Sequence, residues 1–105
     1  MKHDMHLDND PFTKIKNGTK KYEIRLNDVK RKALRVGDSI IFTNRETNET
    51  MVVKVTDLHK YDTVKDIFDN LDNKLLGCKK TDVKKYYTDE EIKKYSLLVI
   101  GIERS

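Results

Sequence analysis

Residues 18–26 read Gly-Thr-Lys-Lys-Tyr-Glu-Ile-Arg-Leu, and the alternation within this stretch decides how the chain folds. From Lys20 to Leu26 the side chains switch face at every residue, which is the period of a β-strand. The apolar face consists of Tyr22, Ile24 and Leu26. The charged face consists of Lys21, Glu23 and Arg25. We therefore expect a strand that buries one side in a core and presents charge on the other.

A strand and a short helix are predicted before this stretch. Lys2 to Asp8 alternates so that one face collects His3, Met5 and Leu7. Asp10 is then a suitable N-cap, Pro11 suits the first helical position, and Gly18 suits a left-handed stop. Such a helix would turn Phe12 and Ile15 inward.

Three further strands are predicted after residues 18–26. Gly37 and Asp38 form a tight turn that leads into a strand over Ser39 to Thr43. Asn44 to Thr50 is a polar hairpin loop, so Met51 to Leu58 is expected to pair antiparallel with that strand. Leu97 to Ile102 is apolar on both faces, which is typical of a strand in the middle of a sheet.

Two helices are predicted between the last two of these strands. Thr63 caps a helix whose apolar positions have helical spacing, namely Val64, Ile67, Phe68 and Leu71. Thr88 and Glu91 form a capping box that opens a short helix ending at Tyr95. The Lys-rich stretch Asp72 to Tyr87, broken by Gly77, is interpreted as loop with one helical turn, and no function is assigned to it from its pattern. The fold class is therefore α+β, a small β-barrel of about five strands with flanking short helices, in one domain over residues 1–105.

Composition limits the class of protein. The chain has 105 residues, 36% hydrophobic and 38% charged, and neither a membrane span nor the apolar core of a secretory signal is visible. We expect a cytoplasmic monomer with no membrane association. Cys78 is the single cysteine, which excludes an internal disulfide and a cysteine zinc site. His3 and His6 point to opposite faces of their strand, so we expect no metal and no other cofactor.

Positive charge is concentrated in one fifth of the chain. Lys14 to Arg35 holds nine basic residues against Glu23 and Asp28, a net charge of +7, whereas the remaining 13 basic and 16 acidic residues give −3. Such a field indicates an anionic partner. The alternative is that a Lys-rich surface merely keeps a small protein soluble.

The sequence resembles a known family at the same stretch. Gly18-Thr19-Lys20-Lys21-Tyr22-Glu23-Ile24-Arg25 is similar to the Gly-x-Lys-x-x-Glu-x-Arg signature of ASCH domains, which are related in fold to PUA domains. Pro11-Phe12-x-x-Ile15-x-x-Gly18 and Val36-Gly37-Asp38-x-Ile40-x-Phe42 resemble the segments on either side of it. The resemblance implies a five- or six-stranded barrel with a cleft near the signature and a general association with RNA metabolism.

The resemblance also implies a possible enzymatic activity. A bacterial branch of the family hydrolyses an acyl amide on a modified cytidine nucleoside with a Lys and a Thr of the signature and a more distant Glu. Lys20 matches that Lys, but Glu23 stands where that Thr would be. A carboxylate cannot replace the Thr nucleophile, although it can serve as a general base for water. The catalytic candidates, if the protein is an enzyme, are therefore Lys20 and Glu23.

The first hypothesis for function is an RNA- or nucleotide-binding domain. Its ligand-binding candidates near the signature are Lys20, Lys21, Glu23 and Arg25. Lys20 points away from the others on a regular strand, so it joins them only if it lies in an irregular segment after Gly18. The candidates for contact with a nucleic-acid backbone are Lys14, Lys30, Arg31, Lys32 and Arg35. The aromatic residues available for stacking are Tyr22, Tyr61, Tyr86 and Tyr87, of which Tyr22 is better explained as a core residue.

Three alternatives remain open at this stage. The first is that Glu23 and Arg25 form a purely structural ion pair on a strand face. The second is that the protein is an amidohydrolase for an acylated cytidine nucleoside. The third is that it is an interaction domain whose basic patch binds an acidic protein partner.

Overall fold

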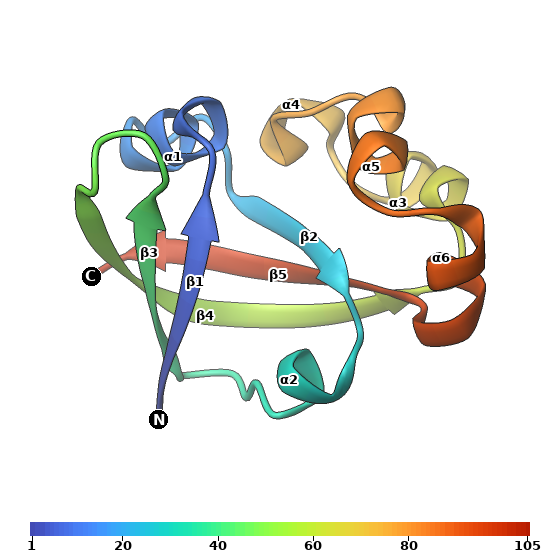
Figure 1. Ribbon diagram of the computed structural model, residues 1–105, viewed down its shortest axis with the longest axis horizontal. Coiled ribbons are helices and arrows are strands. Elements are labelled where there is room, and N and C mark those ends of the chain that lie inside the picture. Colours follow the sequence, from blue (N-terminus) through green and yellow to red (C-terminus); the bar gives the residue numbers. More distant parts are fainter.

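Five strands form one mixed sheet that curls into a half-barrel (Figure 1). The structure is a computed structural model that describes all 105 residues. Across the sheet the strands are β1 (Lys2–Leu7), β3 (Ser39–Asn44), β4 (Thr50–Tyr61), β5 (Leu97–Arg104) and β2 (Tyr22–Leu26). β1 runs parallel to β3, and the other three pairings are antiparallel. The sheet therefore ends in two free edges, one on β1 and one on β2.

Six short helices flank the sheet. They are α1 (Asn9–Lys16), α2 (Val29–Lys32), α3 (Val64–Asn70), α4 (Asn73–Leu76), α5 (Lys80–Tyr86) and α6 (Asp89–Tyr95). Figure 1 shows α3 to α6 gathered on one side of the molecule beyond β2, with α1 above β1 and β3 and α2 at the opposite end. None of the helices is long and apolar enough to cross a membrane.

Two hydrophobic clusters lie on opposite faces of the sheet. The cluster inside the half-barrel comprises Met5, Leu7, Phe12, Ile15, Leu34, Ile40, Phe42, Met51, Val53, Val55, Leu98, Ile100 and Ile102. The cluster under α3 to α6 comprises Ile24, Leu26, Val64, Ile67, Phe68, Leu76, Val83, Ile92, Leu97 and Val99. Because β5 contributes to both, its predicted position inside the sheet and its two apolar faces are confirmed.

The predicted elements are present, with differences at their ends. β4 continues to Tyr61, and a bulge between Val55 and Asp57 reverses its alternation, so that Leu58 packs against the barrel cluster. The sequence predicted Asp10 as the N-cap of α1, but the N-cap is Asp8. Pro11 is the third residue of the helix and is tolerated there because the first four N–H groups have no intrahelical partner.

The prediction for Asp72 to Tyr87 was wrong. This stretch forms α4 and α5 rather than a loop with one turn. α5 lines the pocket described below, and α4 provides the Leu76 carbonyl that accepts a hydrogen bond from Lys20 Nζ. These two helices escape detection because each buries a single apolar residue, Leu76 in α4 and Val83 in α5. One apolar position does not define a helical period.

Asp38 joins the beginning of β1 to the turn before β3. Its Oδ2 accepts hydrogen bonds from His3 Nε2 at 2.8 Å and from the Arg35 N–H at 3.0 Å, while its own carbonyl accepts from the Val55 N–H at 2.8 Å. The hydrogen bond from His3 and that from Arg35 outweigh the opposing effect of burial and lower the pKa of Asp38 from 3.8 to about 2. Asp38 therefore connects three separate segments at this end of the half-barrel.

The pKa of Asp38 predicts a specific dependence of stability on pH. A carboxyl group whose pKa is lowered by folding stabilises the protein above its unfolded pKa, and this contribution disappears as the pH falls toward the folded value. The stability difference between the wild type and Asp38→Asn is therefore expected to be constant above about pH 5 and to shrink between pH 4 and pH 2. Urea denaturation across this range measures it, with Asp4→Asn on the exposed face of β1 as the control. A difference that stays constant down to pH 2 would contradict the assignment.

Candidate functional site

The segment between α1 and β2 places Lys20 beneath the surface. Gly18 has a φ of +85°, and the N–H groups of Thr19 and Lys20 both bond to the Lys14 carbonyl at 3.0 Å. The chain therefore turns tightly before the strand begins at Tyr22. Lys20 lies in this irregular segment and is 3% exposed. Lys20 therefore lies outside the regular strand, which was the condition for its side chain to join those of Glu23 and Arg25.

Lys20 is held between β2 and the α4–α5 connection. Its Nζ donates to the Leu76 carbonyl at 2.5 Å and lies 3.8 Å from Glu23 Oε1. The stem of Lys20 lies against Gly77, where an added Cβ would come within 2.9 Å of the Lys20 Cβ. Gly77 also has a φ of +65°, which other residues rarely adopt. A glycine at position 77 is thus needed for Lys20 to occupy this position.

Arg25 connects Glu23 to the opposite edge of the sheet. Its Nε and Nη2 each lie 2.9 Å from Glu23 Oε2, and Nη2 also donates to the His6 carbonyl on β1 at 2.8 Å. The side chains of Lys20, Glu23 and Arg25 are 3%, 9% and 11% exposed. We refer to these three residues as the buried triad. It contains two cations and one carboxylate, so Glu23 uses one oxygen for each cation.

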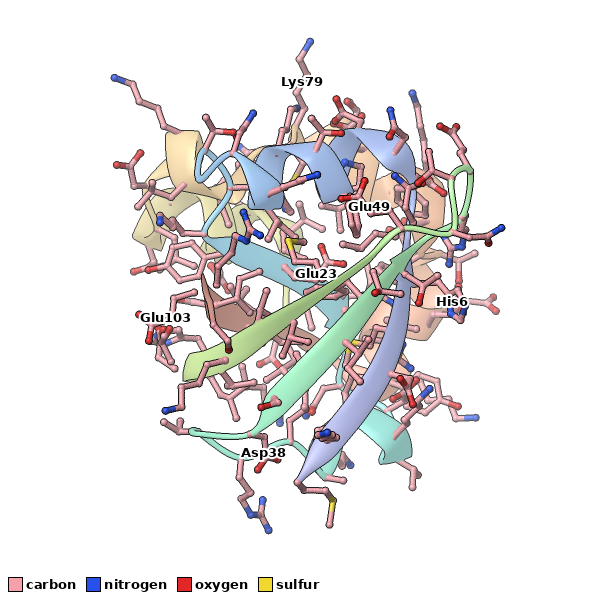
Figure 2. The ribbon with its side chains drawn as sticks, turned by 90° about the vertical axis from the view of Figure 1, so that its left-hand side faces the viewer. His6, Glu23, Asp38, Glu49, Lys79 and Glu103 are labelled. Carbon is pink, nitrogen blue, oxygen red and sulfur yellow. The ribbon has the colours of Figure 1, made fainter.

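The buried triad forms the floor of a pocket of about 500 Å³ between the free edges of β1 and β2. α1 and the segment from Gly77 to Tyr87 provide its walls. Figure 2 shows Glu23 inside the body of the molecule below α1, whereas Lys79 projects outward at the top. The volume lies within the range of sites for small molecules.

Hydrogen bonds among Tyr86, Asp8 and Arg45, which we call the polar latch, close one rim of this pocket. The Tyr86 hydroxyl donates to Asp8 Oδ2, and Arg45 Nη1 donates to Asp8 Oδ1 at 3.0 Å. The hydrogen bond to Asp8 raises the pKa of Tyr86 to about 12, and the bonds from Tyr86 and Arg45 lower the pKa of Asp8. The latch therefore joins α5, the start of α1 and the β3–β4 loop.

Aromatic and apolar groups complete the wall. The ring centroids of Tyr86 and Tyr87 are 6.4 Å apart at 49°, and Val83 and Cys78 line the pocket beside them. Burial raises the pKa of the Tyr87 hydroxyl and of the Cys78 thiol, which keeps both protonated at neutral pH. Cys78 is a free, half-buried thiol, and no group of three metal-ligating side chains occurs in the structure.

The charges that line the pocket are balanced. Its basic lining residues are Lys20, Arg25, Arg45 and Lys85. Its acidic lining residues are Asp8, Asp10, Glu23 and Asp82. A pocket with four groups of each sign offers hydrogen bonds to polar atoms without a net field for a phosphate.

The structure brings some of the sequence-predicted residues together and separates others. Lys21 is exposed and lines a smaller pocket of about 130 Å³ beside Lys20. Lys14 lies at the rim, where its Nζ bonds to the Gly77 carbonyl at 3.1 Å and to Asp10 at 3.0 Å. The remaining basic candidates, which lie outside the pocket on and after α2, are Lys30, Arg31, Lys32 and Arg35. Tyr22 and Tyr61 pack against the cluster under the helices.

Sequence reasoning missed the residues that form the walls and the rim. Asp8, Arg45 and Asp82 belong to separate segments and carry no motif, and Tyr86 meets Asp8 across 78 positions of the chain. The tandem tyrosines were the one visible signal, as a possible stacking pair.

Comparison with known proteins gives one family and several solved structures. The sequence model of the ASCH domain matches residues 5–104. The crystal structure of hypothetical protein PH0355 is 34% identical, with a TM-score of 0.84 and full coverage of both chains. The NMR structure of protein PF0455 from Pyrococcus furiosus is 27% identical, with a TM-score of 0.73, 99% coverage of this chain and 97% of that chain.

A more distant structure shares the fold. The crystal structure of an ASCH domain from Lactobacillus crispatus JV V101 is 13% identical and has a TM-score of 0.65, covering 98% of this chain and 79% of that one. Among curated proteins no significant match was found.

The buried triad predicts a large effect of one substitution. Glu23→Gln removes the single negative charge between Lys20 and Arg25, so the free energy of unfolding is expected to fall by about 3 kcal/mol. Glu103→Gln, at an exposed position of β5, is the control and should change it by less than about 0.5 kcal/mol. Urea denaturation at pH 7 measures both, and equal effects of the two substitutions would refute the electrostatic role of Glu23.

Proposed function

Because the chain belongs to the ASCH domain family, whose relatives are associated with RNA, we propose that it binds a nucleoside or an unpaired base of RNA in the pocket above the buried triad. The observation that carries this proposal is the placement of Lys20, Glu23 and Arg25 at the floor of a pocket with a volume of about 500 Å³. Their polar atoms offer donors and an acceptor, and Tyr87 offers an aromatic surface beside them.

The balance of charge favours an uncharged ligand group inside the pocket. A phosphate would gain nothing from a lining with equal numbers of basic and acidic side chains. A nucleobase with its sugar is neutral and rich in donors and acceptors. The pocket is thus better suited to the base and sugar than to the phosphate.

The phosphates of an RNA would instead meet the basic residues outside the pocket. Lys30, Lys32 and Arg35 are exposed and have no ion-pair partner, whereas Arg31 lies 3.3 Å from Asp28. β2, which lines the pocket, ends at Leu26, and α2 begins at Val29, so the basic residues of α2 follow the pocket-lining strand directly along the chain. A single strand whose base enters the pocket would place its phosphates along α2.

Hydrolysis of an acylated nucleoside is a second candidate function. It is favoured by the distance of 3.8 Å between Lys20 Nζ and Glu23 Oε1. Lys20, which matches the catalytic Lys of the related hydrolases, and Glu23, which stands in the place of their Thr, then line one pocket. No Ser or Thr lines that pocket, so water would have to attack the acyl carbonyl while Glu23 accepts its proton. The C–N bond would then break, and the proton would pass to the leaving amine.

Titration with nucleosides tests the binding function. Cytidine is expected to shift the backbone amides of Lys20, Glu23, Arg25 and Tyr87 in a ¹⁵N spectrum. Arg25→Lys should weaken this binding about tenfold, because Lys lacks the planar fork of donors. Lys32→Gln, outside the pocket, is the matched control and should leave the affinity for cytidine unchanged while weakening that for a short single-stranded RNA.

Two outcomes of this titration would count against the proposal. Salt-sensitive shifts confined to Lys30 to Arg35 would indicate backbone binding without a base pocket. The absence of shifts with every nucleoside and RNA would favour a protein partner for the basic surface.

An assay with N4-acylated cytidine tests the second candidate. An active protein should release cytidine and the free acid, and Glu23→Gln should reduce the rate at least about a hundredfold because the general base is lost. Lys32→Gln should retain full activity. Binding of the acylated nucleoside without any release by the folded wild type would exclude the hydrolase.

A further inference from the structure

The main chain of β2 has one side that is not used by the sheet. The Ile102 N–H donates to the Lys21 carbonyl, and the Asn27 N–H donates to the Ser96 carbonyl. With the antiparallel register of β2 and β5, these bonds assign residues 21, 23, 25 and 27 to the hydrogen-bonded pairs. The residues between them direct both N–H and C=O away from β5, and they are Tyr22, Ile24 and Leu26.

Ile24 is the one of these three that lines the pocket. Its side chain packs into the cluster under the helices, on the face opposite Glu23 and Arg25. β2 is an edge strand, so no neighbouring strand covers the outward N–H and C=O of Ile24. We therefore assign these two main-chain groups, and not the side chain, to the pocket wall. No backbone or side-chain group outside the β2–β5 ladder bonds to either of them.

The facing edge does not satisfy these groups either. On β1 the equivalent outward carbonyl, that of His6, is occupied by Arg25 Nη2 at 2.8 Å. Arg25 therefore spans the gap between the edges at one point and leaves the donor and acceptor of Ile24 free. Nearly all buried backbone N–H and C=O groups in proteins have a hydrogen-bond partner. A donor and an acceptor that lack one at the wall of a pocket therefore favour a ligand that bonds to both.

The geometry of this pair specifies the chemistry of its ligand. An N–H and a C=O of one residue lie side by side on an extended strand and require an acceptor beside a donor in one plane. The Watson–Crick edge of a pyrimidine has this arrangement, with N3 and the amino group in cytosine or N3–H and a carbonyl in uracil. An added peptide strand pairs with a longer run of edge, but only one residue of this edge borders the pocket.

We infer that the main chain of Ile24, and not a side chain, reads the base edge of a pyrimidine in this pocket. This inference rests on the proposed function and adds to it the group that confers specificity. Glu23, Arg25 and Lys20 then contact the remaining polar atoms of the nucleoside. Conservative changes of the Ile24 side chain would leave recognition intact, since that side chain faces the other cluster.

Replacing a single amide by an ester tests the inference. Isoleucine at position 24 is replaced by its α-hydroxy acid, which removes the N–H and keeps the side chain. The same replacement at Tyr22 is the matched control, because Tyr22 lies on the same free edge but does not line the pocket. Each ester also weakens one ladder carbonyl, that of Glu23 or of Lys21, so the effects on stability are comparable.

Calorimetric titration with cytidine provides the measurement. The ester at position 24 should raise the dissociation constant about tenfold, and the ester at position 22 should change it less than about twofold. 3-Methyluridine, whose N3 donor is blocked, should bind at least about tenfold more weakly than uridine to the wild type.

Hydrogen exchange of the unmodified protein gives an independent readout. The Ile24 amide should exchange faster than those of Glu23 and Arg25 in the free protein and slow at least about tenfold when cytidine is bound. Unchanged exchange at Ile24, or equal affinities of the two esters and the wild type, would overturn the inference while the binding function stands. If the wild type binds none of the nucleosides, the proposed function and this inference both fail.

Discussion

The guanidinium group of Arg25 is the contact on which the arrangement of the site depends. The sheet is open between β1 and β2, and Arg25 crosses this opening by bonding both to Glu23 and to the His6 carbonyl. Direct pairing of the two strands would close the barrel and remove the pocket. A long, planar cation holds the edges at a distance and fixes the Glu23 carboxylate at the same time. The opening between the edges of β1 and β2 is therefore maintained by the hydrogen bonds of Arg25.

The charge of the buried triad is connected to the helical wall through carbonyl groups. The carbonyls of three successive residues, Leu75, Leu76 and Gly77, accept hydrogen bonds from the Lys21 N–H, Lys20 Nζ and Lys14 Nζ. The C-terminal end of α4 provides these acceptors because its last carbonyls have no partner within the helix. The excess cation of the triad is thus partly compensated by main-chain dipoles. One consequence is that the signature segment and the α4–α5 connection form a single unit.

The strands of the fold could be predicted from the sequence more fully than the residues of the site, for a physical reason. Strands such as β2 and β5 alternate or are apolar throughout, and that pattern follows directly from which face is buried. α4 and α5 bury one residue each, so no period marks them. Lys20, Glu23 and Arg25 were identified because all three match the signature Gly-x-Lys-x-x-Glu-x-Arg, which lies within one short stretch of sequence. Asp8 and Arg45 were not, because their roles arise only from contacts between distant segments.

The net charge of +7 between Lys14 and Arg35 overstates the field that this segment presents. Lys14, Lys16, Lys20, Arg25 and Arg31 each have a carboxylate partner, so several positive charges are neutralised locally. The basic residues of the segment without such a partner are Lys21, Lys30, Lys32 and Arg35. Three of these belong to α2 or the turn that follows it, outside the charge-balanced pocket. Because neutral and anionic parts of a nucleotide require different surroundings, this separation favours a base inside the pocket and phosphates along α2.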